Sequence, residues 1–214
     1  MYIRYRFKIR KRSGSVVEYV SGKTYGFTVN FTRLMKLILY GIHGGEEFLT
    51  DSYPTLEKVF ISCTALGDGT EYEETQLELT APEGEDKYGI LVGDDSWTDD
   101  FIRDRFKLDV PCLKHKLTEA NGIHYGETKL SDVVQVSTAP ERWCFTVSRN
   151  IYNKSTTEPK YIKEVGLYFK PRDKDRYIMI IYDTISKITN GEYEYYELRP
   201  GEMLTITMNI CLGG

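Results

Sequence analysis

The first ten residues alternate between apolar and basic side chains so strictly that they fit a β-strand with one buried face. The apolar set is Ile3, Tyr5, Phe7 and Ile9, and the basic set is Arg4, Arg6, Lys8 and Arg10. Because successive side chains of a strand point to opposite faces, the two sets lie on opposite sides. Ser13 and Gly14 then supply turn residues before the apolar run 16–20, so residues 2–20 are predicted to form a β-hairpin.

Further strand-like segments follow at short intervals along the chain. They cover residues 59–65, 88–92, 133–137, 143–149, 161–169, 177–182, 193–198 and 203–212. Asn, Gly and Pro between many of them are typical of the turns that join antiparallel strands. With 214 residues and 13% aromatic side chains, the chain has the size and composition of one all-β domain. We therefore predict a single antiparallel β-sandwich, jelly-roll-like, over residues 1–214.

One segment departs from the two-residue period. Between Asn30 and Gly41 the apolar side chains recur at helical spacing, at positions 31, 34, 35, 38 and 42. Asn30 is a suitable N-cap, and Gly41 is a suitable stop. The sequence thus predicts one short amphipathic helix near residues 30–41, whose apolar stripe packs on the core instead of forming a cofactor-binding box.

Charge is unevenly distributed along the chain. The net charge is −4 and the pI about 5.5, a balance that argues against a nucleic-acid-binding protein. Yet the first twelve residues hold six bases and no acid, whereas residues 66–109 hold 14 acids and four bases. No apolar segment follows the basic start and no run of 18 apolar residues occurs, so we predict neither a signal peptide nor a membrane-inserted segment.

The basic face of the first strand is the leading candidate for an interface. Four like charges on one side of a strand repel one another, so an acidic partner is expected opposite Arg4, Arg6, Lys8 and Arg10. Residues 66–109 of a second copy would serve, as would nucleic-acid phosphate; we favour the protein because the aromatic side chains point to the other face. A solvated edge strand whose bases prevent aggregation is the alternative interpretation.

The four cysteines, at positions 63, 112, 144 and 211, are widely spaced and form no CxxC pair. They lie mostly in apolar strand contexts, where a free cysteine behaves as a small hydrophobic residue. We therefore expect four buried thiols in a reducing compartment in preference to disulfides.

Candidate catalytic and metal-binding residues have weak sequence support. None of the histidines at positions 43, 115 and 124 belongs to an HExxH, GxSxG or HRD motif. The acidic stretch with Asp94, Asp95, Asp99 and Asp100 offers oxygen ligands for Ca²⁺, but its spacing fails the EF-hand rule, so we interpret it as a solvated loop. Acid pairs would suit a glycosidase only when the fold holds them at the right separation. The sequence therefore predicts no enzyme, no cofactor and no metal site.

The C-terminal third carries an ordered set of strand and turn motifs. They are Phe-Thr-Val-Ser-Arg at 145–149, Asn153 followed by small polar residues, Glu-Val-Gly-Leu-Tyr at 164–168, Pro-Gly at 200–201 and an alternating strand over 204–210. In order and spacing this set resembles virion structural proteins of tailed phages and of viruses from hot environments, and residues 89–93 are loosely similar to their middle part. The resemblance implies a jelly-roll-like or related sandwich, present in several copies as a tail, neck, fibre-attachment or capsid-associated component.

Two segments depart from that family pattern. The first hairpin is unusually basic, and the loop at residues 171–176 is more charged than the family's small polar loops. Arg172 and Lys174 of this loop are therefore interface candidates, together with the four bases of the first strand.

We expect a non-enzymatic virion component, made in the host cytoplasm, that assembles through strand edges and loops with further copies and with other virion proteins. The alternative is a carbohydrate- or receptor-binding sandwich that recognises a host-surface glycan. Trp97 exposed in a groove with Asp94 and Asp99 would favour a sugar site, and Trp97 packed inward or against another subunit would favour assembly. An enzyme such as a glycosidase or nuclease would need a concave pocket lined by acids and histidines.

Overall fold

The computed structural model describes residues 1–20, 27–40, 43–49, 58–64, 77–95, 112–138, 141–171, 175–185, 187–189 and 192–213. Over these ranges the chain consists mainly of antiparallel strands with one α-helix, which confirms the predicted all-β class. The jelly-roll connectivity is a finer prediction, which these strand pairings do not establish.

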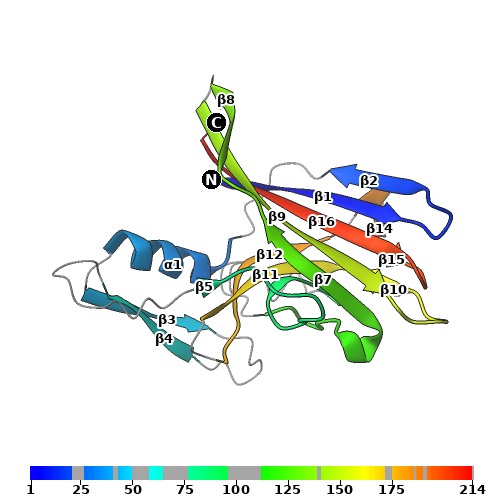
Figure 1. The fold of residues 1–214 in the computed structure, drawn as a ribbon, viewed down its shortest axis with the longest axis horizontal. Helices are drawn as coiled ribbons and strands as arrows, with labels where there is room; N and C mark the ends of the chain where they lie inside the picture. Colours follow the sequence, from blue (N-terminus) through cyan, green and yellow to red (C-terminus); the bar gives the residue numbers. More distant parts are fainter. Residues whose placement is uncertain are drawn as a thin grey trace.

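The main sheet contains both ends of the chain (Figure 1). Its strands are β1 (Tyr2–Arg10), β2 (Val16–Val20), β7 (Ile123–Leu130), β8 (Val134–Thr138), β9 (Glu141–Asn153) and β16 (Met203–Gly213). They lie in the order β2-β1-β16-β9-β7, all antiparallel, and β8 also pairs with β9. Tyr2 lies opposite Cys211, so the first and last strands are neighbours along their length. The predicted N-terminal hairpin and the predicted terminal strand are both confirmed.

A second, smaller sheet packs against the main sheet. It contains β5 (Leu77–Glu78), β6 (Gly89–Gly93), β11 (Glu164–Pro171) and β12 (Ile178–Thr184). Strand β11 pairs with each of the other three. Three two-stranded pairs complete the strands: β3 (His43–Leu49) with β4 (Lys58–Thr64), β10 (Lys160–Ile162) with β15 (Tyr196–Leu198), and β13 (Lys187–Thr189) with β14 (Glu192–Glu194).

The two sheets share one hydrophobic core. Ile3, Phe7 and Ile9 of β1 are buried in it, as the alternation of the first strand predicts. All five residues of β6 and seven of the eight residues of β11 are buried. Continuous apolar runs of this kind belong to strands that are covered on both faces, so the second sheet is the inner layer of the molecule.

The single helix, α1 (Val29–Tyr40), confirms the predicted helix near residues 30–41 but begins differently. Asn30 lies inside the first turn, so the prediction that it is the N-cap is wrong. Its side-chain Nδ2 donates to the carbonyl oxygen of Met179 at 3.1 Å, and Thr28 Oγ1 donates to the same oxygen at 2.8 Å. The Asn30 side chain therefore bonds to strand β12 and does not cap the helix. Gly41 lies outside the described residues.

Several strands differ from the sequence-based prediction. Strand β3 includes Gly44 and Gly45, although glycine is more typical of turns than of strand interiors. Strand β7 was not predicted, because Gly126 and a bulge between Tyr125 and Thr128 interrupt its alternation. The predicted strand 161–169 is divided at residue 163 into β10 and β11, and the predicted strand 193–198 is divided at residue 195 into β14 and β15.

Arg149 of β9 ties the two sheets together and is only 1% exposed. Its guanidinium donates to five backbone carbonyls, those of Pro82, Glu85, Tyr88, Ile90 and Gly126. It also lies 4.7 Å from the ring centroid of Tyr125. Burial lowers the pKa of Arg149 to about 10, which still leaves the cation charged at neutral pH. Gly89 is required beside it, because a Cβ there would meet Thr128 Oγ1 at 2.3 Å and the residue has φ +82°.

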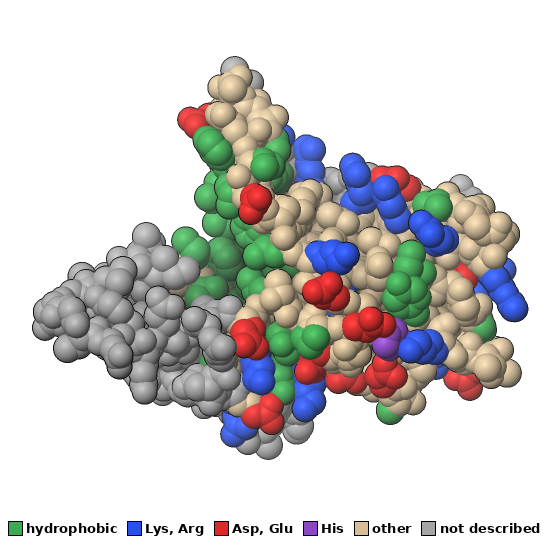
Figure 2. Space-filling model, viewed as in Figure 1, with side chains coloured by type: hydrophobic (Ala, Val, Ile, Leu, Met, Phe, Trp, Pro, Cys, Tyr) green, Lys and Arg blue, Asp and Glu red, His purple; other side chains and the backbone are tan. Residues whose placement is uncertain are grey.

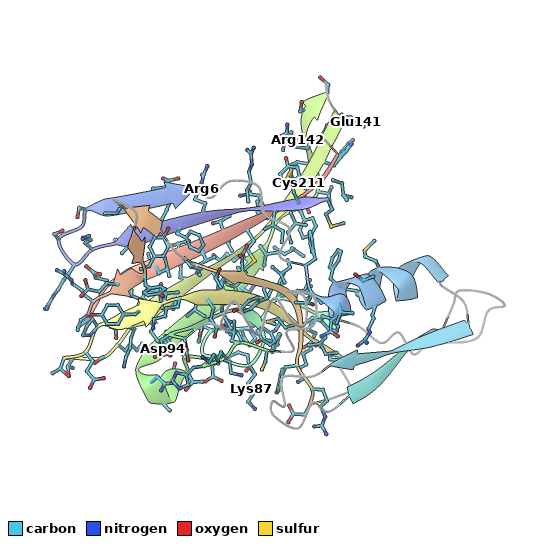
Figure 3. The ribbon with its side chains drawn as sticks, turned by 180° about the vertical axis from the view of Figure 1, so that it is seen from behind. Arg6, Lys87, Asp94, Glu141, Arg142 and Cys211 are labelled. Carbon is cyan, nitrogen blue, oxygen red and sulfur yellow. A yellow bond between two sulfur atoms is a disulfide. The ribbon has the colours of Figure 1, made fainter. Side chains whose placement is uncertain are left out.

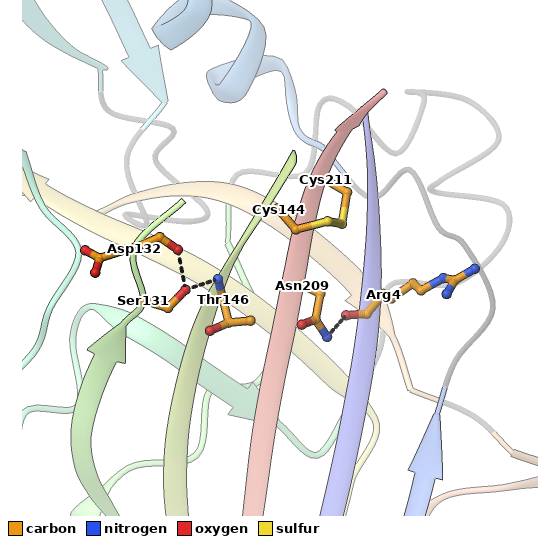
Figure 4. Close-up of a disulfide and its surroundings, with 7 residues drawn as sticks. All are labelled: Arg4, Ser131, Asp132, Cys144, Thr146, Asn209 and Cys211. Atoms are coloured by element: carbon orange, nitrogen blue, oxygen red, sulfur yellow. Dashed lines mark hydrogen bonds between the residues drawn. A yellow bond between two sulfur atoms is a disulfide. The ribbon is translucent and has the colours of Figure 1, made fainter. Parts of the chain in front are cut away.

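A disulfide joins Cys144 of β9 to Cys211 of β16, so the prediction of four thiols is wrong (Figure 4). The two residues are 67 positions apart in the sequence but directly opposite each other in the sheet, with their Cα atoms 4.2 Å apart. Such a close cross-strand pair places two sulfur atoms within bonding distance. Cys112 is a buried thiol, as predicted, and the side chain of Cys63 lies outside the described residues.

Candidate functional site

Strand β8 and the start of β9 extend from the body of the molecule as a projecting arm (Figures 1 and 3). Six large apolar side chains on and near this arm are between 42% and 63% exposed: Leu130, Val133, Val134, Val136, Trp143 and Leu212. Figure 2 shows hydrophobic side chains gathered along the arm and at its base. We call this set the apolar arm. Val134 lies opposite Cys144 and Trp143 opposite Leu212, so the set occupies both faces of the arm. Single exposed apolar residues are ordinary, but several large ones gathered on one projecting element mark an interaction surface.

The register of the main sheet explains why the apolar arm is uncovered. Trp143 lies opposite Leu212, and two residues further along the same strands Phe145 lies opposite Ile210. Side chains two residues apart share a face of a strand, and Ile210 is buried in the core while Phe145 packs against it. The core face of β9 and β16 therefore continues outward beyond the residues that the second sheet covers. On the reverse face, Tyr2, Cys144 and Cys211 form a small buried cluster of their own.

Strand β8 is also an edge strand; it has no charge and no proline, and a register shift between Gln135 and Ser137 interrupts its pairing with β9. Within the described residues it pairs with β9 alone, so its other edge carries backbone groups that no strand binds. Residues 133–138 read Val-Val-Gln-Val-Ser-Thr, with no charge and no proline. Natural edge strands usually carry lysine, proline or a covering segment that blocks pairing with another chain. In residues 133–138 the irregularity between Gln135 and Ser137 is therefore the feature that opposes strand addition, and no charge or proline adds to it.

The basic face of β1 has an acid opposite it in the same chain. Arg6 Nε lies 3.1 Å and Lys8 Nζ 3.5 Å from the carboxylate of Glu18 on the neighbouring β2. The Arg4 guanidinium lies 5.8 Å from the centroid of the Tyr2 ring. One carboxylate thus serves two of the four predicted interface bases, and Arg10 is exposed at the end of the strand. Figure 2 shows the row of Lys and Arg side chains, and their role in an interface stays a prediction.

The two described acids at the start of the loop after β6, Asp94 and Asp95, each lie beside a nitrogen-bearing side chain. Asp94 contacts His115 Nδ1, and Asp95 Oδ2 lies 2.9 Å from Lys114 Nζ. Beneath them Glu164 Oε1 accepts a hydrogen bond from the His115 backbone at 3.2 Å, and burial raises the pKa of Glu164 to about 8. Among the described residues, no group of three or more His, Cys, Asp or Glu is arranged to hold a metal ion.

Four of the predicted interface residues lie outside the described residues: Trp97, Asp99, Arg172 and Lys174. Of the predicted sugar-site residues, Asp94 alone lies within the described part of the chain, so the choice that Trp97 was expected to make between sugar binding and assembly stays a prediction.

A groove of about 750 Å³ lies at the end of the main sheet opposite the apolar arm. It is lined mainly by turns and by two paired strands, and we call it the loop-end groove. The lining side chains that matter chemically are Arg12, Glu83, His124, Tyr152, Lys154 and Glu202. Sequence reasoning missed it, because its walls come from segments that are far apart in the chain. Its lining includes acids and a histidine, which is the kind of concave pocket that we expected an enzyme to need.

The chemistry of the loop-end groove favours binding over catalysis. His124 Nε2 lies 3.0 Å from Glu83 Oε1, and His124 Nδ1 lies 2.5 Å from Glu119 Oε1. Both ring nitrogens thus face carboxylates, so neither is available to take a proton from a nucleophile. The nearby Ser155 Oγ instead accepts hydrogen bonds from the backbone of Thr157 and Glu158.

Comparison of the chain with protein-family models, curated proteins and solved structures finds no match. Within the part of the chain that the structure describes, no helix has the length and apolar character needed to cross a membrane.

Proposed function

We propose that this chain is a non-enzymatic structural protein that assembles through its apolar arm with further copies of itself, as a component of a virion. The observation that carries the proposal is the uncharged edge strand β8 with six exposed apolar side chains around it. The two sheets already enclose a closed core, so this surface adds nothing to the stability of the isolated chain. The virion setting rests on the resemblance in the C-terminal third and is the finer part of the proposal.

A second copy of the chain is the occupant that the arm suits best. Two identical edge strands can pair antiparallel about a two-fold axis, and each then supplies the backbone groups that the other lacks. The arm also carries opposite charges in succession, Glu141 and Arg142, so a two-fold contact would place acid against base (Figure 3). Arg142 Nε is itself buried and has no hydrogen-bond partner in the described residues.

The strength of the contact would come from apolar area. Covering one large apolar side chain contributes roughly 1–3 kcal/mol, and a buried tryptophan is often the residue on which an interface depends most. Trp143 is held for this role, because its indole Nε1 donates to Glu141 Oε1 at 2.8 Å. The bases of β1 would add steering and specificity more than affinity.

The test is the oligomeric state of the full chain, measured by light scattering after size exclusion. The wild type is expected to form dimers or larger species at micromolar concentration. The double variant Val134→Lys with Val136→Lys is expected to be a folded monomer, because two charges on the edge strand oppose pairing. Rings, tubes or fibres in electron micrographs of the wild type would require a second contact besides this two-fold one.

Val16→Lys is the matched control. Val16 lies on β2, the edge strand on the other side of the main sheet, and its exposure of 52% equals that of Val136 within a percentage point. This variant should keep the wild-type oligomer. A monomeric wild type, or an arm variant that assembles as the wild type does, would contradict the proposal.

A further inference from the structure

We propose that the loop-end groove is a binding site for a neutral saccharide. It lies at the far end of the main sheet from the apolar arm, so this inference does not depend on the proposed assembly. The ligand class follows from three properties of the groove: rigid walls, an aromatic surface, and hydrogen-bond donors mixed with acceptors.

The walls of the groove are fixed by the amide of Asn153 at the end of β9. Asn153 Nδ2 donates to the carbonyl oxygens of Glu158 at 2.9 Å and Leu198 at 2.8 Å, and its Oδ1 accepts from the Ser155 backbone at 2.9 Å. Its own carbonyl accepts from the Gly201 backbone at 2.9 Å. One buried side chain thus holds two turns of the groove together. A site whose walls are already ordered loses less entropy when a ligand binds.

The aromatic surface is Tyr152, which is half-buried and paired with His124 on the neighbouring strand. The two ring centroids are 6.0 Å apart. His124 is itself held between Glu83 and Glu119, with one carboxylate facing each ring nitrogen. Tyr152 therefore has a fixed neighbour and a polar hydroxyl at its tip. This arrangement suits a sugar ring, which is apolar on one face and polar at its edge.

Donors and acceptors alternate around the groove. Arg12 and Lys154 supply cationic donors, and Glu83, whose side chain is 73% exposed, supplies a carboxylate. Glu202 is buried, and its Oε2 accepts from the Arg199 backbone at 2.9 Å. A sugar hydroxyl both donates and accepts, so it can use acids and bases together.

Other ligand classes fit the loop-end groove less well. A phosphate or a nucleic acid needs an excess of bases, and here acids accompany the bases. An apolar ligand would leave charged side chains without water or partners. The volume of about 750 Å³ lies in the range of small-molecule sites and has room for one or two sugar units.

The experiment uses the full chain and four probes: maltose, lactose, diacetylchitobiose and, as the anion, inorganic sulfate. Saturation-transfer NMR detects binding, and titration calorimetry measures the affinity. At least one disaccharide is expected to bind at millimolar concentration or below. Tyr152→Ala should weaken that binding about tenfold or more, whereas Tyr152→Phe should retain most of it because the ring remains.

Two further variants separate ligand contact from folding. Glu83→Gln changes an exposed carboxylate and should weaken binding several-fold without unfolding the chain. Tyr195→Ala removes an exposed tyrosine that does not line the groove and should leave the affinity unchanged. The proposal is overturned if no disaccharide binds, if sulfate alone binds, or if Tyr152→Ala and Glu83→Gln both bind sugar as the wild type does.

Discussion

The two ends of the main sheet are built from the same strands and expose opposite kinds of surface. At the arm end, the core face of β9 and β16 outruns the second sheet and leaves Trp143 and Leu212 uncovered. At the loop end, turns close over the sheet and line a polar groove around Tyr152. The alternation of apolar and polar side chains is the same at both ends. What differs is how far the second sheet and the turns extend over the main sheet. Whether an apolar side chain of the main sheet is exposed therefore depends on the elements that cover it and not on the strand pattern.

The largest expected effect concerns Arg149, which lies on β9 between the two ends. Arg149→Met should lower the free energy of unfolding by about 4 kcal/mol, because five backbone carbonyl groups, those of the buried residues Tyr88 and Ile90 among them, lose their donor. Denaturation in urea, followed by both tyrosine and tryptophan signals, measures the loss and shows whether the two ends unfold together.

Arg142→Met on the same strand is the control for that comparison. Arg142 is half-buried at the arm, and its Nε has no hydrogen-bond partner in the described residues. Its replacement should lower the free energy of unfolding of the isolated chain by less than about 1 kcal/mol. Equal losses for the two variants would mean that Arg149 is not what joins the sheets.

The sequence predicts the elements that depend on local pattern. Strands β1 and β16 and helix α1 each have the secondary structure that the spacing of their apolar residues predicts. The burial of Arg149 could also have been found, because alternation puts it in phase with the buried residues Val147 and Ile151 of β9. The disulfide and the loop-end groove could not, since both depend on the register between strands that are distant in the sequence. The exposure of the arm depends on where the second sheet stops.

An effect of comparable size should appear when the pH rises, through Glu164 of the second sheet. Burial raises its pKa from 4.5 to about 8, so between these values the folded chain holds a proton that the unfolded chain has released. Stability must therefore fall as pH rises through this window, by about 1.4 kcal/mol for each unit of pKa difference. The urea midpoint should decrease from about pH 5 to about pH 9 in the wild type and stay nearly constant across this window in Glu164→Gln.

The same substitution at an exposed carboxylate distinguishes this explanation from a general charge effect. Glu83→Gln, at the loop-end groove, should show the wild-type dependence on pH. A wild type with a flat profile would show that the carboxyl of Glu164 is not desolvated, and that the second sheet covers the core less completely than its burial indicates.

The smallest expected effect compares equal charge changes at the two ends. Arg4→Glu with Arg6→Glu alters β1 towards the arm end and should weaken self-assembly several-fold, more strongly at low salt, because these bases steer association more than they hold it. Lys11→Glu with Lys154→Glu makes the same change in net charge towards the loop end, at two exposed residues. Light scattering over a dilution series compares the two. If both pairs weaken assembly equally, net charge alone governs association and the position of the basic face is irrelevant; if neither does, the arm works without it.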